Sequence, residues 1–387
     1  MSTATSSCRS GSTPDERPPA FAARRLRLAD VRCWTRGDVR LPEGLTVVSG
    51  PNGAGKTSLV EAIVLGCLGV SPRTSREAEI VRRGAEALHV DLELHGPEGP
   101  RRREIGYAPG VGRRLRLDDE PVRGLARWRV AGAVLVFVPE ELRAVKGPPG
   151  ARRRHLDRLL EASAPGYADD LTAYGTALAQ RNALLRRVRA GAASTDGLPP
   201  WERQLATHGA RLVAARRAAM RALATPFARR LDALGGGAGT LALEPSPAWL
   251  DEVPDDEVAD ALLAGLERAR PREIAAAQTL GGPHRDDVMV ASDGLDLRRL
   301  GSQGEQRTAV LALLLAHRDH LSADGPAPIL LLDDVMSELD PDRRERLLAG
   351  IGDVGQVVVT SADPDAAALG ARLAQATLRI EPGGRVG

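Results

Sequence analysis

The chain has 387 residues, of which 43% are hydrophobic, enough for two domains that each bury a core. Its longest apolar runs, at 131–138 and 309–316, are about half as long as the ~18 residues that a membrane-spanning helix needs, so the composition argues against a membrane protein. The start of the chain lacks the hydrophobic segment of a signal peptide, and the three cysteines form no CxxC pair, so we expect a cytoplasmic protein without a disulfide framework.

Positive charge is unevenly placed along the chain. The net charge is only +2, yet residues 101–230 contain 26 Lys and Arg against 12 Asp and Glu. Such a segment is typical of a local nucleic-acid surface, although a solvated arginine-rich face gives the same count. Almost every basic residue is Arg, and the only lysines are Lys56 and Lys146. Because an ammonium and a guanidinium are not equivalent, these are candidate positions where Arg cannot serve.

The first part of the chain is predicted to build a sheet. Apolar residues alternate from Arg24 onward, and a second strand runs directly into a glycine-rich turn. A helix at 57–68 follows this turn. The strands expected from period-two alternation or short apolar runs lie at 45–48, 88–94, 113–117 and 133–138.

A helical hairpin is predicted next. Apolar residues recur at spacings of three, four and seven at 171–188 and again at 201–219, on either side of a Gly/Pro-rich break. Each arm is about twenty residues or ~30 Å long, which is far shorter than the coiled coil of a chromosome-spanning SMC protein. Strands return at 329–332 and 356–360. The sheet domain is therefore predicted to be split by a helical insertion.

The glycine-rich turn fits the phosphate-loop pattern GxxxxGK[ST]. Backbone N–H groups of such a loop cradle phosphates, and the following helix adds its positive end. Lys56 would reach the β- and γ-phosphates, and Thr57 would hold Mg²⁺. Because the pattern stands between a predicted strand and a predicted helix, it favours a nucleotide site over a plain turn. This site comprises Gly50, Pro51, Asn52, Gly53, Ala54, Gly55, Lys56 and Thr57.

The apolar strand at 329–332 ends in two carboxylates. This Walker B arrangement predicts that Asp333 holds Mg²⁺ and that Asp334 polarises the attacking water, with Glu338 as the next candidate for that role. A hydrophobic strand capped by acidic turn residues is the alternative. ABC ATPases ordinarily have Glu at the second position, and because Asp334 is one methylene shorter we expect slow hydrolysis.

A third motif, Ser302, Gln303 and Gly304, opens an apolar helix 246 residues after Lys56. A Ser followed by backbone donors at a helix start suits a γ-phosphate oxygen and resembles the ABC signature loop. Glu305 would equally complete an ordinary capping box with Ser302. The order of the motifs favours the signature loop, because Walker A, signature, Walker B and a D-loop at 337–340 follow one another as in ABC and SMC ATPases.

Further blocks of sequence resemble the RecF family from about residue 22 to residue 380. They are 139–142 (PEEL), 145–149 (VKGPP), 152–157 (RRRHLD), 180–185 (QRNALL), 282–287 (GPHRDD), 302–307 (SQGEQR) and 333–340. The chain departs from the family at His155, where an aromatic residue is usual, and at Trp34, where Tyr is usual.

The resemblance implies an α/β fold, namely an ABC/SMC-type P-loop ATPase head with a mixed sheet and helices, split by a mainly helical second lobe with a short helical hairpin. It implies an ATPase lobe formed by 22–140 and 296–387, and a helical lobe at 141–295. Residues 1–21 precede the resemblance, and their Ser, Thr, Pro and charged residues predict a disordered tail. ATP and Mg²⁺ are the expected cofactors, and an ATP-dependent homodimer is the expected assembly.

The function implied by the resemblance is recombinational repair and replication-fork maintenance. The chain would bind single- and double-stranded DNA at gap junctions and work with RecR and RecO in loading RecA. Weak DNA-stimulated ATP hydrolysis would act as the release switch. There are three rival hypotheses. A transporter ATPase subunit is disfavoured by the basic 101–230 segment. A structural SMC-like head would need long heptads and a hinge, and a defence ATPase would need an attached nuclease, and the sequence predicts none of these.

Two other groups of side chains are candidates for binding. Arg32 and Trp34 are expected to flank the adenine, with a surface strand end as the alternative. The candidates for DNA phosphate contacts are Arg152, Arg153, Arg154, Arg186, Arg187 and Arg189. Because no aromatic residues are interleaved with these arginines, they predict sequence-independent binding, whereas a solvated helix face is the alternative.

Overall fold

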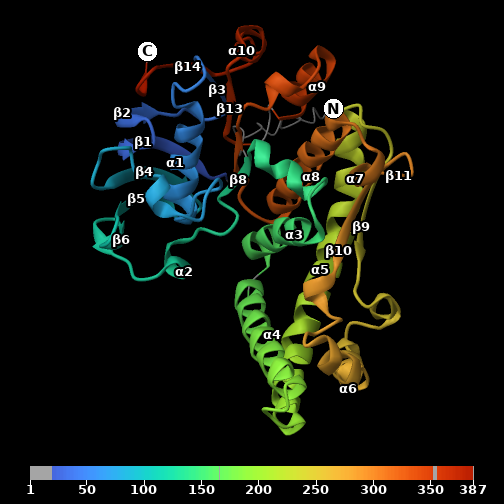
Figure 1. The fold of residues 1–387 in the computed structure, drawn as a ribbon. Helices are drawn as coiled ribbons and strands as arrows, with labels where there is room; N and C mark the ends of the chain where they lie inside the picture. The colour runs from blue at the N-terminus through green and yellow to red at the C-terminus, as the bar shows by residue number, and fades with distance from the viewer. Residues whose placement is uncertain (1–19, 165, 352–354, 387) are drawn as a thin grey trace, which may run out of the picture.

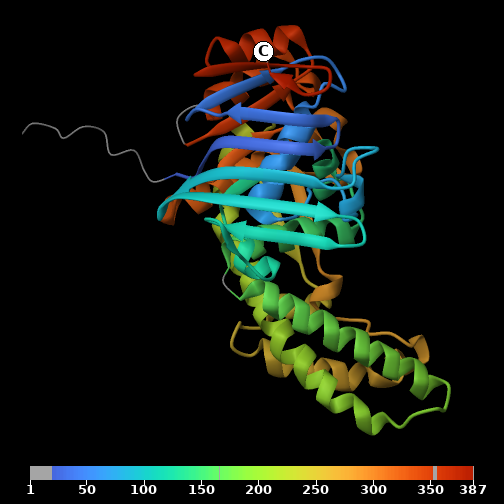
Figure 2. The same cartoon turned by 90° about the vertical axis from the view of Figure 1, so that its left-hand side faces the viewer.

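The computed structural model describes residues 20–164, 166–351 and 355–386. Two six-stranded sheets form the body of the molecule, and a helical arm extends from it (Figures 1 and 2). No helix in the described ranges is long and apolar enough to cross a membrane. Of the tail expected at 1–21, residues 1–19 lie outside the described part. Phe21 already belongs to the fold, since it is buried and its N–H donates to the Ala327 carbonyl at 2.8 Å.

The first sheet is antiparallel, with strand order β2-β1-β4-β5-β6-β7. Its strands are β1 (Ala22–Val31), β2 (Trp34–Arg40), β4 (Leu88–Gly96), β5 (Gly99–Ala108), β6 (Gly112–Leu117) and β7 (Glu120–Pro121). Strict alternation places Leu26 and Leu28 in the core, and Arg25 and Arg27 therefore point to the other face. Strands β2 and β5 were not predicted from the sequence, because their many charged residues and glycines mask the alternation.

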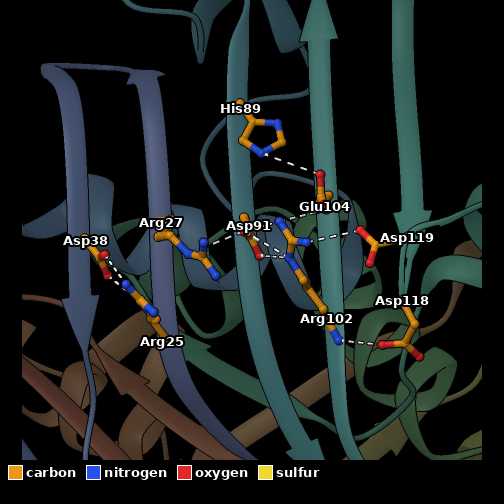
Figure 3. Close-up of polar contacts among 9 residues, drawn as sticks. All are labelled: Arg25, Arg27, Asp38, His89, Asp91, Arg102, Glu104, Asp118 and Asp119. Carbon is orange, nitrogen blue, oxygen red and sulfur yellow. Dashed lines mark hydrogen bonds and ion pairs between the residues drawn. The ribbon is translucent and has the colours of Figure 1, made fainter.

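The outer face of this sheet carries a network of ion pairs across β2, β1, β4 and β5 (Figure 3). Asp91 lies at its centre, 3.4 Å from Arg27 Nε and 3.0 Å from Arg102 Nη2. Arg102 also reaches Glu104 at 3.0 Å and Asp119 at 3.1 Å. These charges neutralise one another in pairs, so this face suits solvent rather than a second apolar layer.

The second sheet has a parallel core in the order β14-β3-β13-β12-β8, with β15 added antiparallel to β14 at one edge. Its strands are β3 (Leu45–Ser49), β8 (Val134–Phe137), β12 (Ile329–Leu332), β13 (Val357–Ser361), β14 (Ala376–Glu381) and β15 (Arg385–Val386). Because the central strands are parallel, their carboxyl ends meet at one edge of the sheet. The loops that follow β3, β12 and β13 are thereby brought together.

Both faces of the parallel sheet are buried, in two different hydrophobic cores. Along β12, Leu330 and Leu332 face the core shared with the helical part, whereas Ile329 and Leu331 face the core beneath the antiparallel sheet. This explains why β12 is apolar at every position. The helices that belong to this region are α1 (Lys56–Leu68), α2 (Leu125–Trp128), α7 (Leu297–Leu300), α8 (Gln303–Asp324), α9 (Pro341–Ile351) and α10 (Pro364–Ala371).

The segment between β8 and α7 builds the arm. It consists of α3 (Pro149–Ser163), α4 (Tyr167–Arg189), α5 (Leu198–Ala233) and α6 (Val258–Ala276), with a sheet of β9 (Gly239–Glu244), β10 (Asp287–Ser292) and β11 (Leu295–Asp296). Helices α4 and α5 form the expected hairpin, which extends away from both sheets (Figure 2). Helix α5 is longer than expected, because Met220, Leu223, Phe227 and Leu231 continue its buried face.

Short 3₁₀ turns occur in both parts of the molecule. They are η1 (Glu77–Glu79), η2 (Pro139–Ala144), η3 (Thr195–Gly197), η4 (Ala248–Glu252), η5 (Pro283–Arg285) and η6 (Met336–Glu338).

Two clusters of buried ion pairs connect the segments of the arm, one at its base and one farther along the hairpin. At its base, Arg216 of α5 pairs with Asp157 and Asp286, each at 2.8 Å. Farther along the hairpin, Arg181 of α4 pairs with Glu202 at 3.0 Å and Glu273 at 2.7 Å. All three members of the second cluster are almost fully buried, and removal of one would leave a buried charge uncompensated. The sequence blocks 152–157, 180–185 and 282–287 thus supply residues of these buried ion pairs.

Candidate nucleotide-binding site

The phosphate loop lies between the end of β3 and the start of α1. Gly50 and Gly55 have φ angles of 149° and 115°, a region that residues with side chains avoid. The ammonium of Lys56 donates to the carbonyl oxygens of Gly50 at 2.8 Å and Pro51 at 3.0 Å. Burial lowers the pKa of Lys56, and the nearby carboxylates of the Walker B strand oppose this shift. A phosphate group held in the loop would give this buried ammonium an anionic partner.

Asp333 is held between two threonines from different loops. Its Oδ1 accepts hydrogen bonds from Thr57 Oγ1 at 3.1 Å and from Thr360 Oγ1 at 2.7 Å. Burial raises the pKa of this carboxyl group, and the two hydroxyl donors partly offset the shift. The Thr57 hydroxyl and the Asp333 carboxylate are oxygen ligands of the kind that Mg²⁺ prefers, so these two residues fit a nucleotide-bound Mg²⁺.

Asp334 has an unusual backbone and an unpaired oxygen. Its φ of 50° is left-handed, and its N–H donates to Thr360 Oγ1 at 3.0 Å. Among the described residues, its buried Oδ1 has no hydrogen-bond partner. A strained residue with an orphaned carboxylate oxygen next to the phosphate loop is suited to receiving a water molecule. The backbone of Glu338 ends η6, but its side chain lies outside what the structure describes.

The candidate signature loop begins α8 with a complete capping box. Ser302 Oγ accepts from the N–H of Glu305 at 3.3 Å, and the Ser302 N–H donates to Glu305 Oε2 at 2.7 Å. Ser302 and Gln303 are exposed, and Gly304 is half-buried. The capping box is thus present in the single chain, and it leaves the helix start facing solvent, where the N–H groups of a first helical turn suit an anion.

Arg32 occupies a left-handed position (φ 53°) at the end of β1, beside the start of the nucleotide helix. Its guanidinium is bidentate on Glu61 of α1, with both N···O distances 2.8 Å, and the Glu61 hydrogen bond raises the pKa of Arg32. Its third donor, Nη1, reaches the Glu79 carbonyl at 2.6 Å. The Arg32 side chain is about one-quarter exposed, and its place beside the adenine stays a prediction.

The expectation that Trp34 flanks the adenine needs correction. Its indole is fully buried behind the phosphate loop, and Nε1 donates to the Gly55 carbonyl at 3.0 Å. No face of the ring is open to a base. A strand end is usually exposed, so the sequence allowed either an adenine contact or a surface position, whereas in the fold Trp34 is buried against the loop.

The six arginines proposed as DNA contacts fall in two places with different environments. Arg152 is 2% exposed and pairs with Asp287, so it is a structural residue of the arm base and the expectation of a DNA contact is wrong for it. Arg153 is half-buried and donates to the Asp286 carbonyl at 2.5 Å, whereas Arg154 is exposed. The exposed residues at the free end of α4 are Arg186, Arg187 and Arg189.

Two residues of the site were not singled out as such by the sequence. Thr360 lies at the end of an apolar strand without any local motif, and it bridges Asp333 and Asp334. Glu61 was missed, and it is fully buried with Arg32, Ser71 and Arg73 around it. A carboxylate within an otherwise apolar helix was the available signal, because a buried acid requires a partner.

Comparison with known proteins agrees with this geometry. Residues 25–109 match a family described as an AAA domain. A protein of Frankia alni named DNA replication and repair protein RecF is 39% identical over 350 residues, covering 87% of this chain and 92% of the relative. One of the same name from Streptomyces avermitilis is 39% identical over 349 residues, with 88% and 93% coverage.

Solved structures give the same result. A structure described as recombination mediator protein RecF with ATP, in the RecFOR pathway, superposes with a TM-score of 0.84 at 25% identity and covers 96% of this chain and 98% of that one. An Smc head bound to a domain of ScpA reaches 0.57 at 15% identity, with 94% and 96% coverage, which shows the shared fold alone. The predicted ABC/SMC-type head is confirmed, and the chain belongs to the RecF family of DNA replication and repair proteins.

Proposed function

We propose that this chain is an ATP-dependent DNA-binding protein that dimerises around ATP. Two molecules of nucleotide would lie between the phosphate loop of one subunit and Ser302 to Gly304 of its partner, related by one two-fold axis. Mg²⁺ would be held by Thr57 and Asp333. Asp334 would orient the attacking water, with slow hydrolysis expected from its short side chain.

This proposal rests on the phosphate loop and the signature loop of one chain lying apart in the fold. In Figure 1, α1 lies at the left, and α7, which leads into Ser302, lies at the right, with α8 between them. The hydrogen-bond partner of the Ser302 hydroxyl among the described residues is Glu305 of its own helix. The signature loop and the phosphate loop of one chain therefore face different surroundings, and a second subunit would bring them together.

The DNA-binding part of the proposal rests on the arm. The arginines at the tip of α4 are exposed, and two arms would project from an ATP-bound dimer as a pair. The proposed role is in the cytoplasm at single-strand gaps, where the dimer would work with RecR and RecO to load RecA. Loss of the γ-phosphate would remove the bridge between subunits and release the DNA.

A binding experiment with gapped DNA tests this function. We expect ATP to tighten binding of the chain to a labelled gapped duplex, and we expect ADP not to do so. Affinity for a fully paired duplex of unrelated sequence should respond to ATP in the same direction, because phosphate contacts carry no sequence information. Equal affinity for gapped DNA with ATP, with ADP and without nucleotide would contradict the proposal.

A further inference from the structure

The Trp34 indole joins three segments that are far apart in the sequence. It starts β2, its Nε1 donates to the carbonyl of Gly55 in the phosphate loop at 3.0 Å, and its ring lies against the turn between β14 and β15 near the end of the chain. The ring is completely buried. A hydrogen bond to the last residue of the loop before Lys56 places this side chain directly behind the nucleotide site.

Three glycines leave the space that the indole occupies. They are Gly37 of β2, Gly55 of the phosphate loop and Gly384 of the C-terminal turn, and a Cβ at any of them would come under 3.0 Å from the ring of Trp34. Real Cβ contacts of this kind essentially do not occur, so each segment approaches the ring with its backbone. The slot is therefore formed jointly by the loop, β2 and the C-terminal turn.

The other end of the phosphate loop touches the same C-terminal hairpin. A Cβ at Gly50 would overlap the carbonyl oxygen of Ile380, and β14 pairs in parallel with β3, which leads into the loop. One hairpin thus supports Gly50 directly and Gly55 through Trp34. The hairpin turn itself is closed by a hydrogen bond of 3.1 Å from the Gly384 N–H to the Glu381 carbonyl.

We propose that Trp34 is a positioning residue that couples the phosphate loop to the β14–β15 hairpin. The hairpin holds the indole in place, and the indole holds the Gly55 carbonyl so that the following Lys56 and helix start face the phosphates. Because such coupling is reciprocal, displacement of the hairpin weakens nucleotide binding and bound nucleotide stabilises the hairpin. This inference rests only on nucleotide binding at this loop and not on dimerisation or DNA binding.

Two neighbouring glycines provide a matched pair of variants. Gly383 and Gly384 lie in the same turn with φ of 85° and 78°, so Ala strains the backbone similarly at both. A Cβ at Gly383 meets nothing within 4 Å, whereas one at Gly384 meets the indole. We expect Gly384→Ala to weaken binding of a fluorescent ATP analogue by about tenfold, the equivalent of ~1.4 kcal/mol, and Gly383→Ala to change it by less than about twofold. Equal affinities for the two variants would overturn the proposal.

A second pair separates positioning from general stability. Trp34→Phe removes the donor to Gly55, and Trp128→Phe changes another buried tryptophan, which lies beneath the Arg103 guanidinium at 4.3 Å. Both variants should melt at lower temperature than the parent chain. Only Trp34→Phe should also lose nucleotide affinity at a temperature where both remain folded. Equal affinity losses in the two would assign Trp34 a merely structural role.

The parent chain offers a test that depends on no variant. Saturating ATP should slow amide hydrogen exchange at 381–386 as well as in the phosphate loop. Protection of the loop without protection of the hairpin would overturn the coupling. A parent chain that binds no ATP at all would instead refute the nucleotide site itself, so the two failures are distinguishable.

Discussion

The hydroxyl of Thr57 donates a hydrogen bond of 3.1 Å to Oδ1 of Asp333, although the two residues are 276 positions apart. The parallel sheet makes this contact possible, because β3 and β12 both end at the same edge and β13 lies between them. Thr360, from the end of β13, donates to the same oxygen. The fold alone thus places the candidate Mg²⁺ ligands side by side.

Lys56→Arg should weaken nucleotide binding although it retains the positive charge. The ammonium fits between the Gly50 and Pro51 carbonyls as a compact donor, and the larger planar guanidinium cannot occupy the same space. Titration with a fluorescent ATP analogue, together with ATP turnover, measures the effect. Normal turnover in this variant would contradict the assignment of the phosphate loop.

Asp334→Asn should bind ATP and hydrolyse it poorly. An amide cannot polarise water as a carboxylate does, and the variant keeps the size of the side chain and the hydrogen bond from the backbone to Thr360. Single-turnover hydrolysis, measured beside the dissociation constant for ATP, separates the two effects. Hydrolysis at the parental rate would move the role to another carboxylate, with Glu338 the next candidate.

Replacement of the three arginines at the tip of α4 by Gln should weaken DNA binding for all sequences alike. The log–log salt dependence of binding should become shallower by about 0.9 for every phosphate that the variant no longer neutralises. A matched control replaces Arg36, Arg40 and Arg114, which are exposed on the antiparallel sheet. If the slope of the control variant fell as much as that of the arm variant, the arm would not be the DNA surface.

Arg152→Leu should lower the free energy of unfolding by about 1–3 kcal/mol, because it removes a buried ion pair, although Asp287 is partly exposed and keeps Arg298 as a partner. Arg154→Leu, on the exposed side of the same helix, should change it by less than about 0.5 kcal/mol. Denaturant unfolding of the two variants gives the comparison. Equal stability would make Arg152 a candidate for DNA contact again.

Local patterns in the sequence were sufficient for the phosphate loop and for β12, because each motif is contiguous and its strand is apolar throughout. The roles of individual side chains such as Arg152 and Trp34 depend on tertiary contacts, which local sequence patterns do not show. Arg152 looks like Arg154 in a run of three arginines, and only the position of Asp287 on β10 separates their roles. Trp34 likewise depends on a turn near residue 384 that no local pattern connects with the loop.

Ser302→Arg addresses the assembly itself. It places a bulky charge at the proposed subunit interface without changing the phosphate loop, so the variant should bind ATP as a monomer and lose ATP-dependent DNA retention. Ser194→Arg is its matched control, since Ser194 is also an exposed serine whose side chain caps a helical turn, at the tip of the hairpin. The control should dimerise like the parent.

Sedimentation velocity with saturating ATP and Mg²⁺ tests the central claim most directly. The account predicts that the parent chain and Ser194→Arg sediment as dimers, and that Ser302→Arg sediments as a monomer with nucleotide bound. A parent chain that stays monomeric under saturating ATP, or a dimeric Ser302→Arg variant, would contradict the ATP-bridged dimer.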